Sequence, residues 1–135
     1  MPREPELKQL EVVAGILRNG EGSVLITERM EDGPLHGLWE FPGGKIDTDE
    51  EPAAALIREL REEIGVEVTA LAELVRLEHE YPDRSVAIHF FLIDAWRGDP
   101  ESREGQRLKW VSPAGLADEN LLPADLPVIE LLERR

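Results

Sequence analysis

The 135-residue sequence contains no cysteine, which excludes disulfide bonds and thiolate chemistry and is compatible with a reducing cytoplasm. It has no apolar run of about 18 residues and no charged-then-apolar leader, so we expect neither a membrane span nor a secretory signal. Basic residues are scarce: 15 lysines and arginines face 29 acids, for a formal net charge of −14. This charge disfavours DNA or RNA polymers as partners, whereas a small phosphate ligand complexed to a metal ion stays compatible.

Two common catalytic patterns are also missing. The segment P-G-G-K at 42–45 invites comparison with a P-loop, which requires G-x-x-x-x-G-K-[ST]. In that alignment Trp39 takes the first glycine position and Ile46 the last, so kinase and ATPase functions are poorly supported. Neither a Ser-His-Asp nor a Cys-His arrangement is indicated. The three histidines lack ligand spacing and are expected to be structural or at the surface: His36, His79 and His89.

Residues 44–66, GKIDTDEEPAAALIRELREEIGV, carry the most informative pattern. Pro52 suits a first helical turn, where its missing N–H costs nothing. Gly65 suits the residue just past a helix, in the left-handed conformation. The residues between them predict a helix whose apolar stripe faces the core: Ala53, Leu56, Ile57, Leu60 and Ile64.

Three glutamates cluster on a different face of this helix. Glu59, Glu62 and Glu63 stand at i, i+3 and i+4, where their carboxylates repel one another and only Arg58 is at hand to neutralise them. Taken alone, such a run is usually a solvated acidic face. The alternative is a site for hard divalent cations, which take oxygen ligands and offset the repulsion.

The same segment matches G-x5-E-x7-R-E-U-x-E-E-x-G-U at every fixed position, where U is a bulky aliphatic residue. This is the Nudix box, and the chain resembles the Nudix hydrolases. The resemblance favours the metal site and implies Mg²⁺, with Mn²⁺ as a substitute, held by the three glutamates and the carbonyl of Gly43. It places Arg58 among the catalytic residues, bracing the loop and helix through an ion pair with Glu50. The matched positions are Gly44, Glu50, Arg58, Glu59, Leu60, Glu62, Glu63, Gly65 and Val66.

Stretches outside the box resemble the MutT type of Nudix hydrolase, which removes oxidised nucleotides from the precursor pool. The resemblance implies that Glu104 approaches the metal ions as a further ligand and candidate base, and that Arg29 lies near the phosphates. It further implies a substrate pocket formed by Phe41, Tyr81, Arg84 and Asp125. The supporting stretches are LWEFPGGK (38–45), EYPDR (80–84), REGQ (103–106), KWVSP (109–113) and PADLPVI (123–129).

Asp125 departs from the MutT pattern, which has asparagine at this position to recognise 8-oxoguanine. An ionised aspartate only accepts hydrogen bonds, from a cytosine amino group or from the N–H groups of a guanine edge. The alternative is that Asp125 merely caps the last helix. Tyr81 could equally be a packing residue, and Arg84 a turn residue after Pro82.

The remaining sequence predicts strands interleaved with helices, and hence an α/β or α+β domain over residues 1–135. The Nudix resemblance implies an α/β/α sandwich with a mixed β-sheet. We expect strands at 10–17 and 23–27 joined as a hairpin through 19–22, a loop at 30–37, and strands at 38–41, 66–77, 85–95 (central) and 110–111, with a turn at 42–44, a brief helix from 112 and a last helix at 126–133.

We therefore expect a Mg²⁺-dependent nucleoside triphosphate pyrophosphohydrolase that releases a monophosphate and pyrophosphate. The favoured substrate is 8-oxo-dGTP, with CTP or 5-methyl-dCTP second and ADP-ribose third. The competing class is a catalytically silent binding module, which would be expected to lose the box glutamates and to carry a basic face. The expected partner is a small nucleotide, in a cytoplasmic monomer or homodimer.

Overall fold

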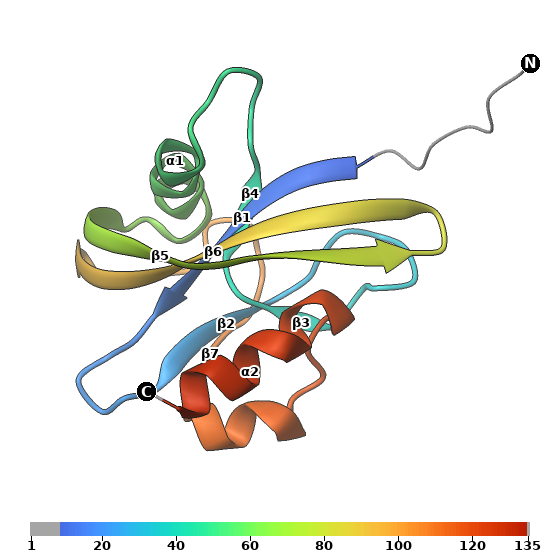
Figure 1. Cartoon of the computed structure of the whole chain (residues 1–135). Helices are drawn as coiled ribbons and strands as arrows, with labels where there is room; N and C mark the ends of the chain where they lie inside the picture. Colours follow the sequence, from blue (N-terminus) through green and yellow to red (C-terminus); the bar gives the residue numbers. More distant parts are fainter. Residues whose placement is uncertain (1–8, 135) are drawn as a thin grey trace, which may run out of the picture.

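The computed structural model describes residues 9–134, and its strands form two sheets (Figure 1). The larger sheet has the order β4-β1-β6-β5; β1 and β6 run parallel and the other pairs antiparallel, so the sheet is mixed. The smaller sheet, β3-β2-β7, is antiparallel. The elements are β1 (Gln9–Leu17), β2 (Val24–Glu28), β3 (Trp39–Glu40), β4 (Gly43–Lys45), α1 (Pro52–Ile64), β5 (Glu67–Tyr81), β6 (Arg84–Arg97), β7 (Leu108–Val111), the 3-10 helices η1 (Pro113–Asp118) and η2 (Pro123–Asp125), and α2 (Leu126–Glu133).

The mixed sheet separates two helical layers, with α1 on one face and α2, beside the smaller sheet, on the other (Figure 1). The side chains of β1 pack into both layers, because successive side chains of a strand point to opposite faces of its sheet. Val13 and Leu17 pack toward α1, whereas Ala14 and Ile16 pack toward the smaller sheet and α2. The predicted α/β/α sandwich with a mixed sheet is thus confirmed. None of the helices within residues 9–134 is long and apolar enough to cross a membrane.

The predicted hairpin between the first two strands is wrong. β1 and β2 lie in different sheets and meet through one antiparallel bridge, between Arg18 and Val24. The turn itself forms, since the side-chain oxygen of Asn19 accepts the backbone N–H groups of Glu21 and Ser23. Both edges of β1 are already filled, by β4 and β6, so the turn directs β2 into a second sheet.

Other boundaries differ more modestly. β5 and β6 are longer than the strands predicted at 66–77 and 85–95, and they form a hairpin closed at Pro82–Asp83. The segment predicted as a turn at 42–44 contains β4, which pairs with β1. β6 is central as predicted, and the predicted boundaries of α2 are confirmed. Ser112 caps η1 as predicted, its hydroxyl accepting the N–H of Gly115 at 3.2 Å.

Helix α1 has the predicted limits. Pro52 opens it, and Gly65 ends it at φ 72°, donating its N–H to the carbonyl of Arg61. Leu60, Leu56 and Ile64 are fully buried, while Ala53 and Ile57 pack at the edge of the same cluster. Gly15 of β1 allows the close approach, because a Cβ there would stand 3.1 Å from the Leu60 side chain. This packing fixes the glutamate face of α1 against β4.

Candidate active site

A cavity of about 520 Å³ lies where β1, β4, α1 and the 122–125 segment meet. Its size is within the usual range for small-molecule sites. One group of lining residues combines three acids, Glu59, Glu63 and Glu104, with the two glycines Gly43 and Gly44. A second group combines aromatic, basic and acidic side chains, namely Arg29, Phe41, Tyr81, Arg84 and Asp125. The structure therefore brings together all but two of the predicted site residues, the exceptions being Glu62 and Arg58.

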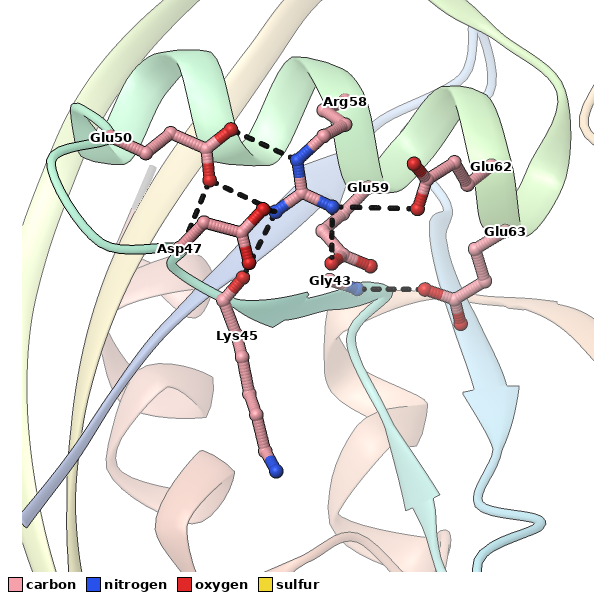
Figure 2. A network of polar contacts seen from close by, with 8 residues as sticks. All are labelled: Gly43, Lys45, Asp47, Glu50, Arg58, Glu59, Glu62 and Glu63. Atoms are coloured by element: carbon pink, nitrogen blue, oxygen red, sulfur yellow. Dashed lines mark hydrogen bonds and ion pairs between the residues drawn. The ribbon is translucent and has the colours of Figure 1, made fainter.

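Arg58 holds the loop before α1 against the helix, and its ion pair with Glu50 is confirmed (Figure 2). Its guanidinium donates to both carboxylate oxygens of Glu50 at 2.9 Å and to the carbonyl of Lys45 at 3.1 Å. The two hydrogen bonds from Arg58 to Glu50, together with one from the Asp47 N–H, lower the pKa of Glu50 to about 2. A planar fork with several donors suits this bridging role, which a lysine cannot reproduce.

The other side of the same guanidinium faces the helix glutamates. Arg58 donates to Glu59 at 2.9 Å and lies 3.4 Å from Glu62 (Figure 2). The Glu59 side chain is 20% exposed, whereas that of Glu62 is 59% exposed. Burial raises the pKa of Glu59, against the opposing effect of Arg58. Helical spacing thus predicts the shared face correctly, but Glu62 lies at its solvent edge.

The surroundings of Glu63 shift its pKa strongly. Its carboxylate accepts the Gly43 N–H at 3.1 Å and the Thr27 hydroxyl at 3.4 Å. Burial, followed by the nearby charge of Glu40, raises its pKa to about 8 despite the hydrogen bond from Gly43. Carboxyl groups gathered in this way repel one another, and protonation or a bound cation relieves that repulsion.

The acidic group fits a divalent cation in its chemistry. Carboxylate oxygens are the donors that hard cations prefer. Gly44 leaves room for the Glu59 carboxylate, because a Cβ at this position would overlap it, with Oε1 at 2.8 Å. Within residues 9–134, however, no three acidic or histidine side chains stand close enough together to enclose an ion. Some of the carboxylate oxygens are instead hydrogen-bonded to Arg58 and to the Gly43 N–H.

The second group is organised around the 122–125 segment. Leu122 donates its N–H to the carbonyl of Trp39, and Ala124 donates its N–H to the Tyr81 hydroxyl at 3.3 Å. These bonds place Asp125 beside Phe41, whose N–H donates to its carboxylate at 3.3 Å. Asp125 does not cap α2 with its side chain, so the capping alternative is wrong. Tyr81 both lines the cavity and anchors this segment.

Asp125 is only 3% exposed and pairs with no cation within residues 9–134. Burial raises its pKa well above the usual value, and the charge of Glu40 adds to the effect. The hydrogen bond from Phe41 and the charge of Arg29 act in the opposite direction. The assumption of an ionised aspartate, natural from sequence, therefore disagrees with its surroundings, which favour the neutral acid.

Two arginines complete the lining. Arg29 donates to Glu40 at 3.2 Å and to Glu31 at 2.6 Å. The Nε of Arg84 is buried without a hydrogen-bond partner among the described residues. A buried, unpaired donor is costly unless a ligand or water satisfies it, so Arg84 is suited to meet an acceptor in the cavity.

Sequence reasoning missed three charged lining residues, Glu31, Glu40 and Lys45. Burial raises the pKa of Glu40, and Arg29 partly offsets it. An acid inside the apolar run LWEF was a usable signal for Glu40. Lys45 follows the two glycines, and its ammonium group extends away from the Arg58 network (Figure 2). None of the three histidines lines the cavity; His89 instead contacts Glu11 at 3.1 Å.

A mixed-sheet sandwich with acidic oxygen donors and basic groups around one cavity fits the chemistry of an enzyme that binds a phosphorylated ligand with a divalent cation. The comparison with known families agrees, since the NUDIX domain matches residues 8–132. The chain belongs to the NUDIX family and is a hydrolase that acts on phosphoanhydride bonds. Members of this family generally need a divalent metal ion.

Individual relatives are similar over nearly their whole length. The 8-oxo-dGTP diphosphatase of Escherichia coli (strain K12) is 40% identical over 128 residues, covering 95% of this chain and 99% of the relative. The CTP pyrophosphohydrolase of the same organism is 37% identical, covering 92% and 91%. A solved structure from a study of MutT from Aliivibrio salmonicida and Vibrio cholerae has a TM-score of 0.79 at 36% identity, covering 93% and 97%.

Proposed function

We propose that this protein is a Mg²⁺-dependent nucleoside triphosphate pyrophosphohydrolase, with 8-oxo-dGTP as its preferred substrate and 8-oxo-dGMP and pyrophosphate as products. The observation that carries the proposal is that one cavity is lined both by two Nudix-box glutamates, Glu59 and Glu63, and by a buried acid beside aromatic side chains. The first group suits a metal-complexed triphosphate and the second suits a base. The similarity to an 8-oxo-dGTP diphosphatase over 95% of the chain supports this assignment.

Glu59, Glu62, Glu63 and Glu104, with the carbonyl of Gly43, are the residues we assign to Mg²⁺. The chemistry supplied by such an ion, when bound, is neutralisation of phosphate oxygens and a lowered pKa of the attacking water. Arg29 is suited to orient the phosphates, because its guanidinium already lies at the cavity between two acids.

Asp125 is assigned to the base. A neutral carboxyl group offers one donor and one acceptor, as the side chain of asparagine does, whereas a carboxylate only accepts. The surroundings of Asp125 favour the neutral form. One of its oxygens accepts the Phe41 N–H, which leaves the other for the edge of the base. This supports an oxidised guanine as the substrate even though the usual asparagine is absent.

The second candidate is a cytosine nucleotide, CTP or 5-methyl-dCTP. Asp125 would then act as a carboxylate and accept a hydrogen bond from the exocyclic amino group. The observation that favours it is the similarity to a CTP pyrophosphohydrolase at 37% identity over 124 residues.

The deciding experiment measures kcat/KM with Mg²⁺ for 8-oxo-dGTP, dGTP, CTP and 5-methyl-dCTP, with products identified, for the wild type and Asp125→Asn. We expect at least about a hundredfold preference for 8-oxo-dGTP over dGTP, equal to about 3 kcal/mol, and retention of this preference in the variant. A preference for the cytosine nucleotides that Asp125→Asn abolishes would overturn the proposal in favour of the second candidate.

A matched control separates an enzyme from a binding module. Glu63→Gln keeps the shape of the side chain and removes its charge, so we expect kcat to fall by about a hundredfold or more. A protein that binds nucleotides equally tightly before and after this change, and hydrolyses none of them, would exclude the enzymatic assignment.

A further inference from the structure

Gln106 is a buried polar residue in a loop that is otherwise exposed. It is 4% exposed, while residues 101–105 and Arg107 all face solvent. This loop, between β6 and β7, carries Glu104 to the cavity. Buried amides are retained where each of their groups finds a partner, so the contacts of Gln106 show what its burial achieves.

The Gln106 amide makes three hydrogen bonds. Its oxygen accepts the N–H of Glu104 at 2.9 Å and the hydroxyl of Ser102 at 2.8 Å. Its nitrogen donates to the carbonyl of Glu63 at 3.0 Å. The orientation of the amide is fixed by this pattern, because a flipped amide would set its N–H groups against the N–H of Glu104.

The partner on the helix side is a carbonyl at the C-terminal end of α1. Carbonyls in the last turn lack intrahelical partners. Here the loop supplies them: Arg103 donates its N–H to the carbonyl of Glu63, and Glu101 donates to that of Ile64. Backbone bonds therefore hold the start of the loop, and Gln106 joins its later part, at Glu104, to the same turn of α1.

The Glu104 side chain makes no hydrogen bond within residues 9–134, and the flexible Gly105 follows it at φ 83°. The backbone N–H of Glu104 is thus the point at which this residue is held. We propose that Gln106 is a positioning residue that fixes Glu104 at the cavity relative to Glu63. This inference rests on the proposed role of Glu104 at the metal site.

The contacts favour a positional role over simple stabilisation. The carbonyl of Glu63 keeps the N–H of Arg103 as a partner when Gln106 is replaced. The Ser102 hydroxyl and the Glu104 N–H lie in an exposed loop and can turn to water. Loss of the amide therefore leaves few groups unsatisfied, while it releases the hydrogen bond made by Glu104 itself and leaves Arg103 as the nearest residue held to α1.

The test is a double-mutant cycle with Gln106→Met, Glu104→Gln and the double variant, assayed at saturating metal ion. Gln106→Met should lower kcat about 10–100-fold, as loss of a residue that supports metal ligands typically does, with KM for the nucleotide nearly unchanged. In the Glu104→Gln background the same substitution should lower kcat less than about threefold. Equal losses in both backgrounds would overturn the proposal.

A second readout is independent of catalysis. Amide hydrogen exchange at Glu104 should become faster in Gln106→Met, while exchange in α1 stays slow; unchanged exchange would refute the positioning. Faster exchange together with full activity of Glu104→Gln would keep the positioning and reject the catalytic role of Glu104.

One further variant serves as a control. Leu132→Ala, in the last turn of α2, destabilises the protein away from the loop and should keep kcat.

Discussion

Substitution by alanine should affect different properties at the two adjacent glycines before α1: stability at Gly43 and activity at Gly44. At Gly43, a new Cβ would overlap the carbonyl oxygen of Val13 and stand 2.9 Å from the Cα of Ala14. Both belong to the backbone of β1 and cannot move without breaking the β1–β4 pairing. At Gly44, the Cβ would overlap only the carboxylate of Glu59, the far end of a flexible side chain.

The magnitudes follow from what has to move. Overpacking that shifts backbone typically costs about 1–3 kcal/mol, so Gly43→Ala should lower the free energy of unfolding by at least that amount. Gly44→Ala should change it by less than about 1 kcal/mol, because a glycine also costs entropy on folding. Its effect falls on Glu59, and displacement of a metal ligand predicts a loss of about 10–100-fold in activity.

Urea unfolding and kcat/KM with 8-oxo-dGTP measure the two effects separately. Gly20→Ala is the matched control, because a Cβ there meets nothing within 4 Å; it should alter neither quantity appreciably. If Gly44→Ala proves fully active, then the position of the Glu59 carboxylate does not depend on the space left by this glycine. If Gly43→Ala is as stable as the wild type, the β1–β4 contact is looser than described.

Three further predictions follow from burial and charge. Because burial raises the pKa of Asp125, the folded protein binds this proton more tightly than the unfolded chain. The free energy of unfolding of the wild type therefore falls as pH rises above about 4. That of Asp125→Asn, relative to the wild type, should rise by up to about 1.4 kcal/mol per pH unit in urea titrations. Arg58→Lys should raise the pKa of Glu50 from about 2 toward its ordinary value, which an NMR titration would detect. Leu60→Ala, at a fully buried position, should cost about 2–5 kcal/mol in thermal or urea unfolding while sparing the site chemistry.

Helix α1 was predictable because its determinants are local. Pro52 and Gly65 mark its ends, and the apolar spacing orients it, without reference to any other part of the chain. Strand pairing was less accessible, since the partners of β1 lie far along the sequence. The turn at Asn19 is present as predicted, but β4 and β6 pair with the two edges of β1, so β2 lies in the other sheet.

The same distinction applies to the site. Helical spacing along α1 predicted that Glu59 and Glu63 lie together, and the resemblance added Asp125. Asp125 is 84 positions from Phe41 in the sequence, and its hydrogen bond with the Phe41 N–H holds it at the cavity. Gln106 escaped notice because its partner on α1 lies 43 positions away. A raised pKa of Asp125 could not be foreseen, for a physical reason: residue type gives the usual pKa, whereas burial and the charge of Glu40 raise it.

Metal removal should expose a conflict between stability and function at Glu63. Its raised pKa, about 8, means that the folded protein without metal loses stability as pH rises from about 4.5 to 8. Glu63→Gln lacks this loss, so in chelator at pH 7 it should be more stable than the wild type, by on the order of 3 kcal/mol. With Mg²⁺ at about a hundred times its Kd, the wild type should gain about 2.7 kcal/mol and the variant much less. Thermal unfolding with and without chelator would show whether the order of stability of the two proteins reverses.

A variant that is less stable than the wild type in chelator would mean that the hydrogen bonds from Gly43 and Thr27 outweigh the cost of burying the Glu63 carboxylate. The protein would then hold this carboxylate without help from a cation.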